Sequence, residues 1–321
     1  MITHRLALTA SILIPALMLG GCAIEQHEIM EAQVKVAEPR ALPVFSGLSG
    51  QAVTLDEVIA AAAGADVVVI GENHGHPAGL GAAAAIWAGV LEQAPKAALA
   101  MEFFERDEQS HVDDYLTGVT DEGAFKKATG RSESNYPAGH RAMVEAARTK
   151  GRPVMAANAP RQYVRLARLK GYEYLGTLTA EQRRLFRIPD QVPTGRYRDD
   201  FNKIMMGMGG HEEEGKPAKP VTITPEKMAE LDATFRSQSM WDWTMAESIV
   251  RACEGGNGPV VHVVGRFHED FGGGTIQAVQ HLRPGVKIVT VSFVDKARTA
   301  LADEDKGRAD FVVYAGVNQA K

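Results

Sequence analysis

The sequence predicts an α/β fold in which a mainly parallel β-sheet carries helices on both faces and a helical insertion interrupts the chain. Short apolar runs rich in β-branched residues alternate with segments of helical periodicity, a pattern typical of strand–helix–strand units. Strands joined by crossover helices run parallel. Between about residues 160 and 255 the strand signal disappears and helical patterns dominate, which indicates the insertion.

The first predicted strand covers residues 67–70. Four β-branched apolar residues in succession, ended by a glycine, are typical of a strand that is buried on both faces. A helix at 54–63 precedes it, and Thr54 and Glu57 have the spacing of a capping box. The apolar positions of residues 78–94 share one helical face, which predicts a crossover helix packed on the sheet.

The later elements follow from the same patterns. Apolar runs predict strands at 97–101, 153–157, 260–264, 287–294 and 311–314. Helical periodicity predicts helices at 106–117, 138–150, 225–252 and 275–282. Within the insertion, a methionine-rich run followed by His211 to Glu214 has two interpretations, a flap that binds a soft metal or a solvated loop.

The chain begins with a segment that resembles the signal peptide of a bacterial lipoprotein. Arg5 precedes an apolar stretch that is too short for a comfortable membrane span. The stretch ends in Leu19-Gly20-Gly21-Cys22, which resembles a lipobox. That resemblance implies removal of residues 1–21 and lipid attachment at Cys22. The alternative is an apolar stretch followed by an incidental cysteine.

Residues 22–50 lack sustained periodicity, so we expect a tether between the lipid and a domain that covers residues 51–321. Ala23, and not aspartate, follows Cys22, and the sorting rule associated with such lipoproteins then favours the outer membrane. The localisation expected from the sequence is therefore the cell envelope, with the protein anchored to a membrane by lipid.

Charge and cysteine content limit the other possibilities. The net charge of −5 argues against nucleic acid as a partner. With lipid on Cys22, the second cysteine, Cys253, has no partner within the chain. The stability of the mature protein must therefore come from a hydrophobic core.

Polar side chains follow four of the predicted strands at the point where each strand ends. Because the carboxyl ends of parallel strands meet at one edge of the sheet, we expect these side chains to converge there. They are Glu72, His74, Glu102, Asn158, Arg266 and His268.

Two carboxylates and two imidazoles of this set suggest chemistry. Glu72, His74, Glu102 and His268 could hold a divalent metal ion, or could act as base and electrophile around a hydrolytic water. Spacing does not decide between these roles, because the residues come from separate strands. The alternative is a polar loop of solvated side chains. His262 lies inside its strand and is expected to be a core histidine.

Five short motifs occur in order along the chain. They are Val69-Ile70-Gly71-Glu72-Asn73-His74, Ala100-Met101-Glu102, Ala157-Asn158-Ala159-Pro160-Arg161, Trp241-Asp242-Trp243-Thr244-Met245-Ala246 and Gly265-Arg266-Phe267-His268. Together they resemble a known family, the ChaN-like haem-binding lipoproteins of the Tiki and erythromycin-esterase-like superfamily. The likeness covers roughly residues 50–315 and implies an α/β/α sandwich, a lipid anchor and a role in haem-iron acquisition. It also implies haem binding in homodimers that stack two haems face to face, with tyrosine as axial ligand.

The resemblance suggests roles for individual residues. Gly195-Arg196-Tyr197-Arg198 resembles the region in which the family places its tyrosine, so Tyr197 is the candidate iron ligand, unless it is a packing residue. Asn158 and Arg266 are further candidates for cofactor binding.

The same motifs match the metal-dependent hydrolases of the superfamily. On that reading Glu72, His74, Glu102 and His268 would form the catalytic site, with a divalent metal. Arg266 departs from the small residues that often precede the family's last histidine. The sequence therefore leaves two functions open: a haem-binding protein for iron acquisition, or a hydrolase that cleaves an ester or a peptide.

Overall fold

The computed structural model describes residues 38–207 and 224–316. The predicted signal peptide, Cys22, the first part of the tether and the run from His211 to Glu214 lie outside these residues. Among the helices that the structure describes, none is both long and apolar enough to cross a membrane.

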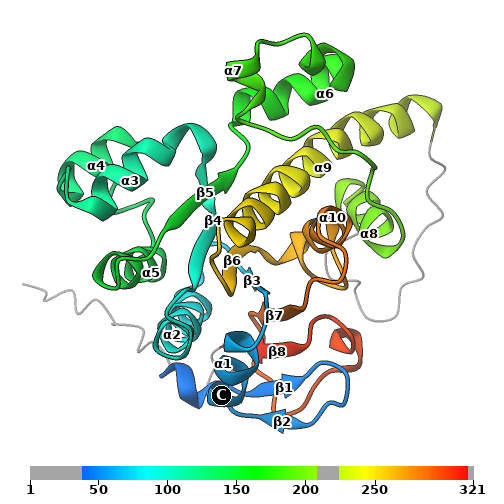
Figure 1. Ribbon diagram of the computed structural model, residues 1–321. Helices are drawn as coiled ribbons and strands as arrows, with labels where there is room; N and C mark the ends of the chain where they lie inside the picture. The colour runs from blue at the N-terminus through cyan, green and yellow to red at the C-terminus, as the bar shows by residue number, and fades with distance from the viewer. Residues whose placement is uncertain (1–37, 208–223, 317–321) are drawn as a thin grey trace, which may run out of the picture. The chain divides into compact units, whose positions relative to one another are not determined.

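An eight-stranded sheet organises the domain (Figure 1). Its strands lie in the order β2-β1-β8-β7-β3-β6-β4-β5. The six strands from β8 to β5 in this order run parallel to one another. Strand β1 pairs antiparallel with β8 on one side and with β2 on the other. The strands are β1 (Val44–Ser46), β2 (Ala52–Val53), β3 (Val67–Glu72), β4 (Ala98–Glu105), β5 (Val154–Asn158), β6 (Val260–Gly265), β7 (Ile288–Val294) and β8 (Phe311–Tyr314).

Helices cover both faces of the sheet and make the predicted α/β/α sandwich (Figure 1). Because successive side chains of a strand point to opposite faces, Val68 and Ile70 pack with helices α1, α2 and α5, and Val67 and Val69 pack against α9 and α10. The helices are α1 (Leu55–Ala63), α2 (Pro77–Gln93), α3 (Gln109–Thr117), α4 (Glu122–Ala128), α5 (Ala138–Thr149), α6 (Arg161–Gly176), α7 (Ala180–Arg183), α8 (Arg196–Met205), α9 (Pro225–Glu254) and α10 (Gly274–Leu282).

Local sequence explains where several helices begin. Thr54 and Glu57 form the expected capping box at the start of α1. His76 caps α2 through a hydrogen bond from the backbone of Gly79, and proline occupies the first turn. Thr224 caps α9 in the same way. These caps satisfy backbone N–H groups that have no partner inside the helix.

Two boundaries differ from the sequence prediction. The sheet includes β1, within residues that were expected to belong to the tether, because the apolar pair Val44 and Phe45 is buried against β8. In the insertion, no strand lies between β5 and β6 among the described residues, as expected. Its last helix is nevertheless part of the sandwich, since Trp243, Met245 and Ile249 of α9 pack on the sheet.

Candidate functional site

A cleft of about 1160 Å³ opens at the carboxyl edge of the sheet, where β3, β6 and β4 are neighbours. Register places Glu72 at the end of β3 beside Gly265 at the end of β6. Strand β4 pairs with β6 only as far as Met101, and its pairing with β5 shifts register before Glu105. Glu102 therefore lies where β4 loses its regular pairing with both neighbouring strands, and its side chain lines the cleft.

Glu72 is the buried centre of the first part of the site. Its side chain is only 4% exposed, and its two oxygens lie 3.1 Å from His74 Nδ1 and 2.7 Å from His140 Nε2. Burial alone would raise the pKa of this carboxyl, but the two hydrogen-bonded imidazoles outweigh it and lower the pKa to about 2. Sequence analysis missed His140, which lies within α5 with no motif around it.

His74 presents its second ring nitrogen to the cleft. Its side chain is 72% exposed, and within the described residues Nε2 has no hydrogen-bond partner. Nε2 lies 2.8 Å from the position that a Cβ on Gly265 would occupy, so a larger residue there would displace the ring. The hydrogen bond that Nδ1 donates to Glu72 is the main cause that raises the pKa of His74. An imidazole that a carboxylate orients through Nδ1 is the usual arrangement of a metal-binding histidine.

Glu102 and His268 form the second part. One oxygen of Glu102 accepts a hydrogen bond of 2.6 Å from the backbone N–H of Gly265, and the other lies 3.7 Å from His268 Nε2. His268 Nδ1 lies 2.7 Å from Asp242 Oδ1, and Asp242 is fully buried on α9. Burial disfavours the charged imidazole, but the charges of Asp242 and Glu102 outweigh it and raise the pKa of His268 to about 9.

Asp242 was not predicted as a site residue, although it lies in the motif of α9 that carried the family resemblance. It follows Trp241 and precedes Trp243, and an aspartate between two tryptophans on an apolar helix is a signal for a buried, hydrogen-bonded carboxylate.

Tyr197 is buried and hydrogen-bonded in this structure. The sequence suggested it as the iron ligand, but its side chain is 4% exposed and its hydroxyl donates a hydrogen bond of 2.7 Å to Asp242 Oδ2. The Tyr197 hydroxyl oxygen in turn accepts a hydrogen bond of 2.9 Å from Gln238 Nε2. Burial, together with the negative charge of Asp242, raises the pKa of Tyr197 well above its ordinary value. In this structure Tyr197 is therefore a packing residue that supports Asp242.

The remaining predicted residues divide between cleft and scaffold. Asn158 lines the cleft, and its side-chain oxygen accepts a hydrogen bond from the backbone of Ala159. Arg266 forms an ion pair of 3.5 Å with Asp270, and its place outside the cleft does not fit the cofactor contact expected for it. His262 is a fully buried core histidine, as expected, and burial lowers its pKa to about 4.

The arrangement does not support the expected metal ion. In the part of the chain that the structure describes, no three histidine, cysteine, aspartate or glutamate side chains are placed to share one ion. Of the candidate ligands, Glu72 is hydrogen-bonded to two imidazoles and His268 to Asp242.

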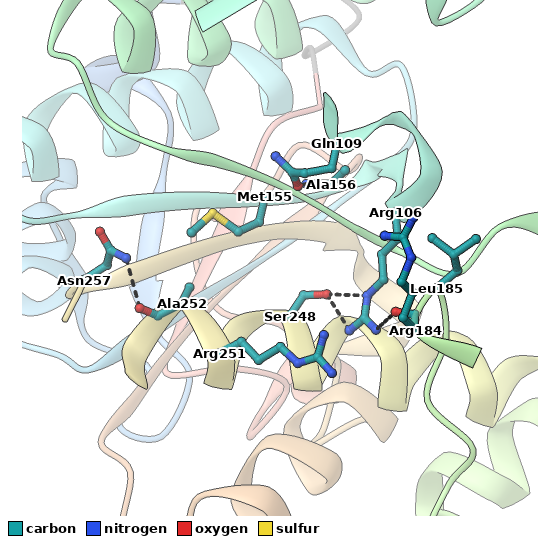
Figure 2. Close-up of a pocket in the computed structure, with 10 residues that line it drawn as sticks. All are labelled: Arg106, Gln109, Met155, Ala156, Arg184, Leu185, Ser248, Arg251, Ala252 and Asn257. Atoms are coloured by element: carbon teal, nitrogen blue, oxygen red, sulfur yellow. Dashed lines mark hydrogen bonds between the residues drawn. The ribbon is translucent and has the colours of Figure 1, made fainter. Parts of the chain in front are cut away.

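A second, smaller cavity of about 330 Å³ lies on the outer side of β5 (Figure 2). It contains none of the predicted site residues. Its most buried cation, Arg106, hydrogen-bonds to Ser248 Oγ and to the backbone oxygen of Thr244, and pairs with Glu247 at 2.8 Å. These contacts connect the end of β4 to α9, so the polar groups of this cavity serve the scaffold.

Comparison with known proteins identifies the family. The model of the family described as haem-binding uptake proteins, Tiki superfamily, ChaN, matches residues 58–279. The chain belongs to this family. The match spans the β3, β4 and β6 ends that form the cleft, and it includes Asp242 and His268.

One solved structure supports the fold, and two more are similar at lower TM-scores. A structure of ChaN of Campylobacter jejuni with cofacially bound haem is similar over 85% of this chain and 96% of its own, with a TM-score of 0.62 at 16% identity. The type III effector HopBA1 covers 88% and 100% (TM-score 0.44, 12% identity), and a mutant of the erythromycin esterase EreC in its open conformation covers 85% and 82% (0.42, 13%). The search of curated proteins gave no match.

Proposed function

We propose that this protein binds haem in the cleft at the carboxyl edge of the sheet and takes part in haem-iron acquisition. The observation that carries the proposal is the exposed Nε2 of His74, which Glu72 orients inside a cleft of about 1160 Å³. Neutral imidazole is a common axial ligand of haem iron. Membership of the haem-binding uptake family and the fold shared with ChaN support the same function.

The walls of the cleft suit a flat, largely apolar ligand with a polar edge. Typical pockets for small organic ligands have volumes of about 300–1,000 Å³, so this cleft is large enough for a macrocycle. Apolar and aromatic side chains line it, and arginines stand among them. The apolar residues are Phe103, Pro137, Val164, Phe201, Met205, Trp241 and Val263.

We further propose that the protein works at the cell envelope, anchored by lipid on Cys22, with the outer membrane as the favoured location. The lipobox-like sequence and Ala23 support this proposal. We also propose that the haem-loaded form is a homodimer, as the family resemblance implies.

Titration of the mature protein with haemin tests haem binding. We expect a saturable change of the Soret band in the wild type and a weaker, spectrally altered complex in His74→Ala. His111→Ala removes an exposed histidine of α3 that does not line the cleft, and it should bind like the wild type. If the wild type shows only the unsaturable binding of a nonspecific protein, the proposal is wrong.

A second candidate function, hydrolysis of an ester or a peptide, is favoured by one specific observation. Two carboxylate–imidazole pairs, Glu72 with His74 and Asp242 with His268, lie on either side of Glu102, an arrangement suited to general acid–base catalysis. A panel of esters and peptides would detect this activity. Hydrolysis that is abolished in His74→Ala and intact in His111→Ala would support the hydrolase function. The absence of turnover above background would rule this function out.

A further inference from the structure

Helix α6 places a row of three arginines along the cleft. Arg161, Arg165 and Arg168 are spaced by four and three residues, so they share one helical face, and all three line the cleft. The opposite face of α6 packs on α9 through Tyr163 and Ala167 in an apolar cluster that includes Met240. The packing fixes the rotation of the helix, so the arginine row faces the cleft as a result of the fold.

Two members of this row lack a partner of opposite charge. Arg161 pairs with Glu105 at 3.3 Å. Over the described residues, the guanidinium groups of Arg165 and Arg168 neither donate a hydrogen bond nor lie within ion-pair distance of a carboxylate. Both side chains are exposed.

Another arginine of the cleft is held by the protein itself. Arg131 makes two hydrogen bonds of 2.9 and 3.0 Å to Glu108 and stacks on the ring of Phe103 at 4.5 Å. Its two terminal nitrogens donate to protein acceptors, whereas its Nε is buried without a hydrogen-bond partner among the described residues. By contrast, Arg165 and Arg168 are exposed cations of the cleft that make no such contacts within the described residues, so they are available to a ligand.

We propose that Arg165 and Arg168 bind the two propionate carboxylates of haem and so orient the macrocycle in the cleft. The inference rests on the proposed function. It places the edge of haem that carries the propionates beside helix α6. Guanidinium groups bind carboxylates through parallel N–H···O bonds, and two of them match the two carboxylates of the ligand.

The test compares haemin with its dimethyl ester, in which both carboxylates are capped. In the wild type haemin should bind at least about tenfold more tightly than the ester. The double variant Arg165→Ala/Arg168→Ala should lose that preference, bind the ester like the wild type, and keep the wild-type Soret position because iron ligation is unchanged. Arg165→Lys/Arg168→Lys should restore part of the preference.

A charge-matched control is Lys170→Ala/Arg183→Ala. It also removes two exposed cations from this region, but neither residue lines the cleft. It should keep the wild-type preference for haemin. If the arginine double variant and this control show the same preference for haemin over its dimethyl ester, the inference about the arginines is wrong, although the proposed haem binding is unaffected. If the wild type binds neither ligand saturably, the proposed function itself fails.

Discussion

At the scale of single residues, Asp242 has the most demanding position in the site. It is fully buried, and three donors surround its carboxylate: His268 Nδ1 at 2.7 Å, the Tyr197 hydroxyl at 2.7 Å and Thr275 Oγ1 at 2.9 Å. A buried carboxylate is stable only when it is paired and hydrogen-bonded. Gly274 allows this packing, since a Cβ there would lie 2.2 Å from Asp242 Oδ2.

The His268–Asp242 pair predicts how stability depends on pH. The groups that face His268 are Asp242 of α9, Glu102 of β4 and the more distant His262 of β6. Burial disfavours the charged imidazole, but the negative charges of Asp242 and Glu102 outweigh it and raise the folded pKa of His268 to about 9. A raised histidine pKa gives stability that is complete below the unfolded value of about 6.5 and is lost as pH rises through the folded value.

We therefore expect the difference in free energy of unfolding between the wild type and His268→Gln to shrink between about pH 7 and about pH 10. Denaturant unfolding at each pH measures it. His111→Ala, which changes an exposed histidine, should show a difference from the wild type that is constant with pH. A gap for His268→Gln that stays constant or widens would show that this histidine is neutral in the folded protein.

At the scale of elements, β5 ends the sheet and needs protection on its outer side. The side-chain amide of Gln109 supplies it, because Nε2 donates to the backbone oxygen of Val154 at 2.9 Å and Oε1 accepts from the backbone N–H of Ala156 at 2.7 Å. One glutamine thus replaces the hydrogen bonds that a further strand would make.

Replacing this glutamine tests the role of the side chain. Gln109→Ala leaves two partly buried backbone groups without partners, so it should lower the free energy of unfolding by about 1–3 kcal/mol. Gln162→Ala, an exposed position on α6, should change it by less than about 0.5 kcal/mol. Denaturant unfolding compares the two, and equal effects would contradict the capping role.

The elements were largely predictable from the sequence because their signals are local. The buried run Val67 to Ile70, the capping box at Thr54 and the apolar stripe of α9 each identify their element without reference to the rest of the chain. β1 was not predicted, because three residues carry no period and only pairing with β8 makes them a strand.

At the scale of the whole molecule, the sheet edge was predictable and its network of partners was not. Strand ends placed Glu72, His74, Glu102 and His268 in the right region, because parallel neighbours end together. His140 and Asp242 arrive from helices, and no sequence spacing connects them to the strands. For the same reason the burial of Tyr197 could not be read from its helix.

Attachment to the membrane is a separate prediction at this scale. If Cys22 carries lipid, Cys22→Ser should leave the protein unprocessed or in the soluble fraction, whereas the wild type should partition with membranes. Cys253→Ser, which changes the other cysteine, should behave like the wild type. A Cys22→Ser protein that still partitions with membranes at the wild-type level would contradict the lipid anchor.

The central claim is that His74, and not Tyr197, faces haem iron in the cleft. The most direct measurement is the visible absorption spectrum of haemin-loaded His74→Ala beside that of Tyr197→Phe. The account predicts that His74→Ala loses or changes the wild-type spectrum, while Tyr197→Phe keeps it and is only less stable, by about 1–3 kcal/mol. A Tyr197→Phe protein without the wild-type spectrum, next to a His74→Ala protein that retains it, would contradict the account.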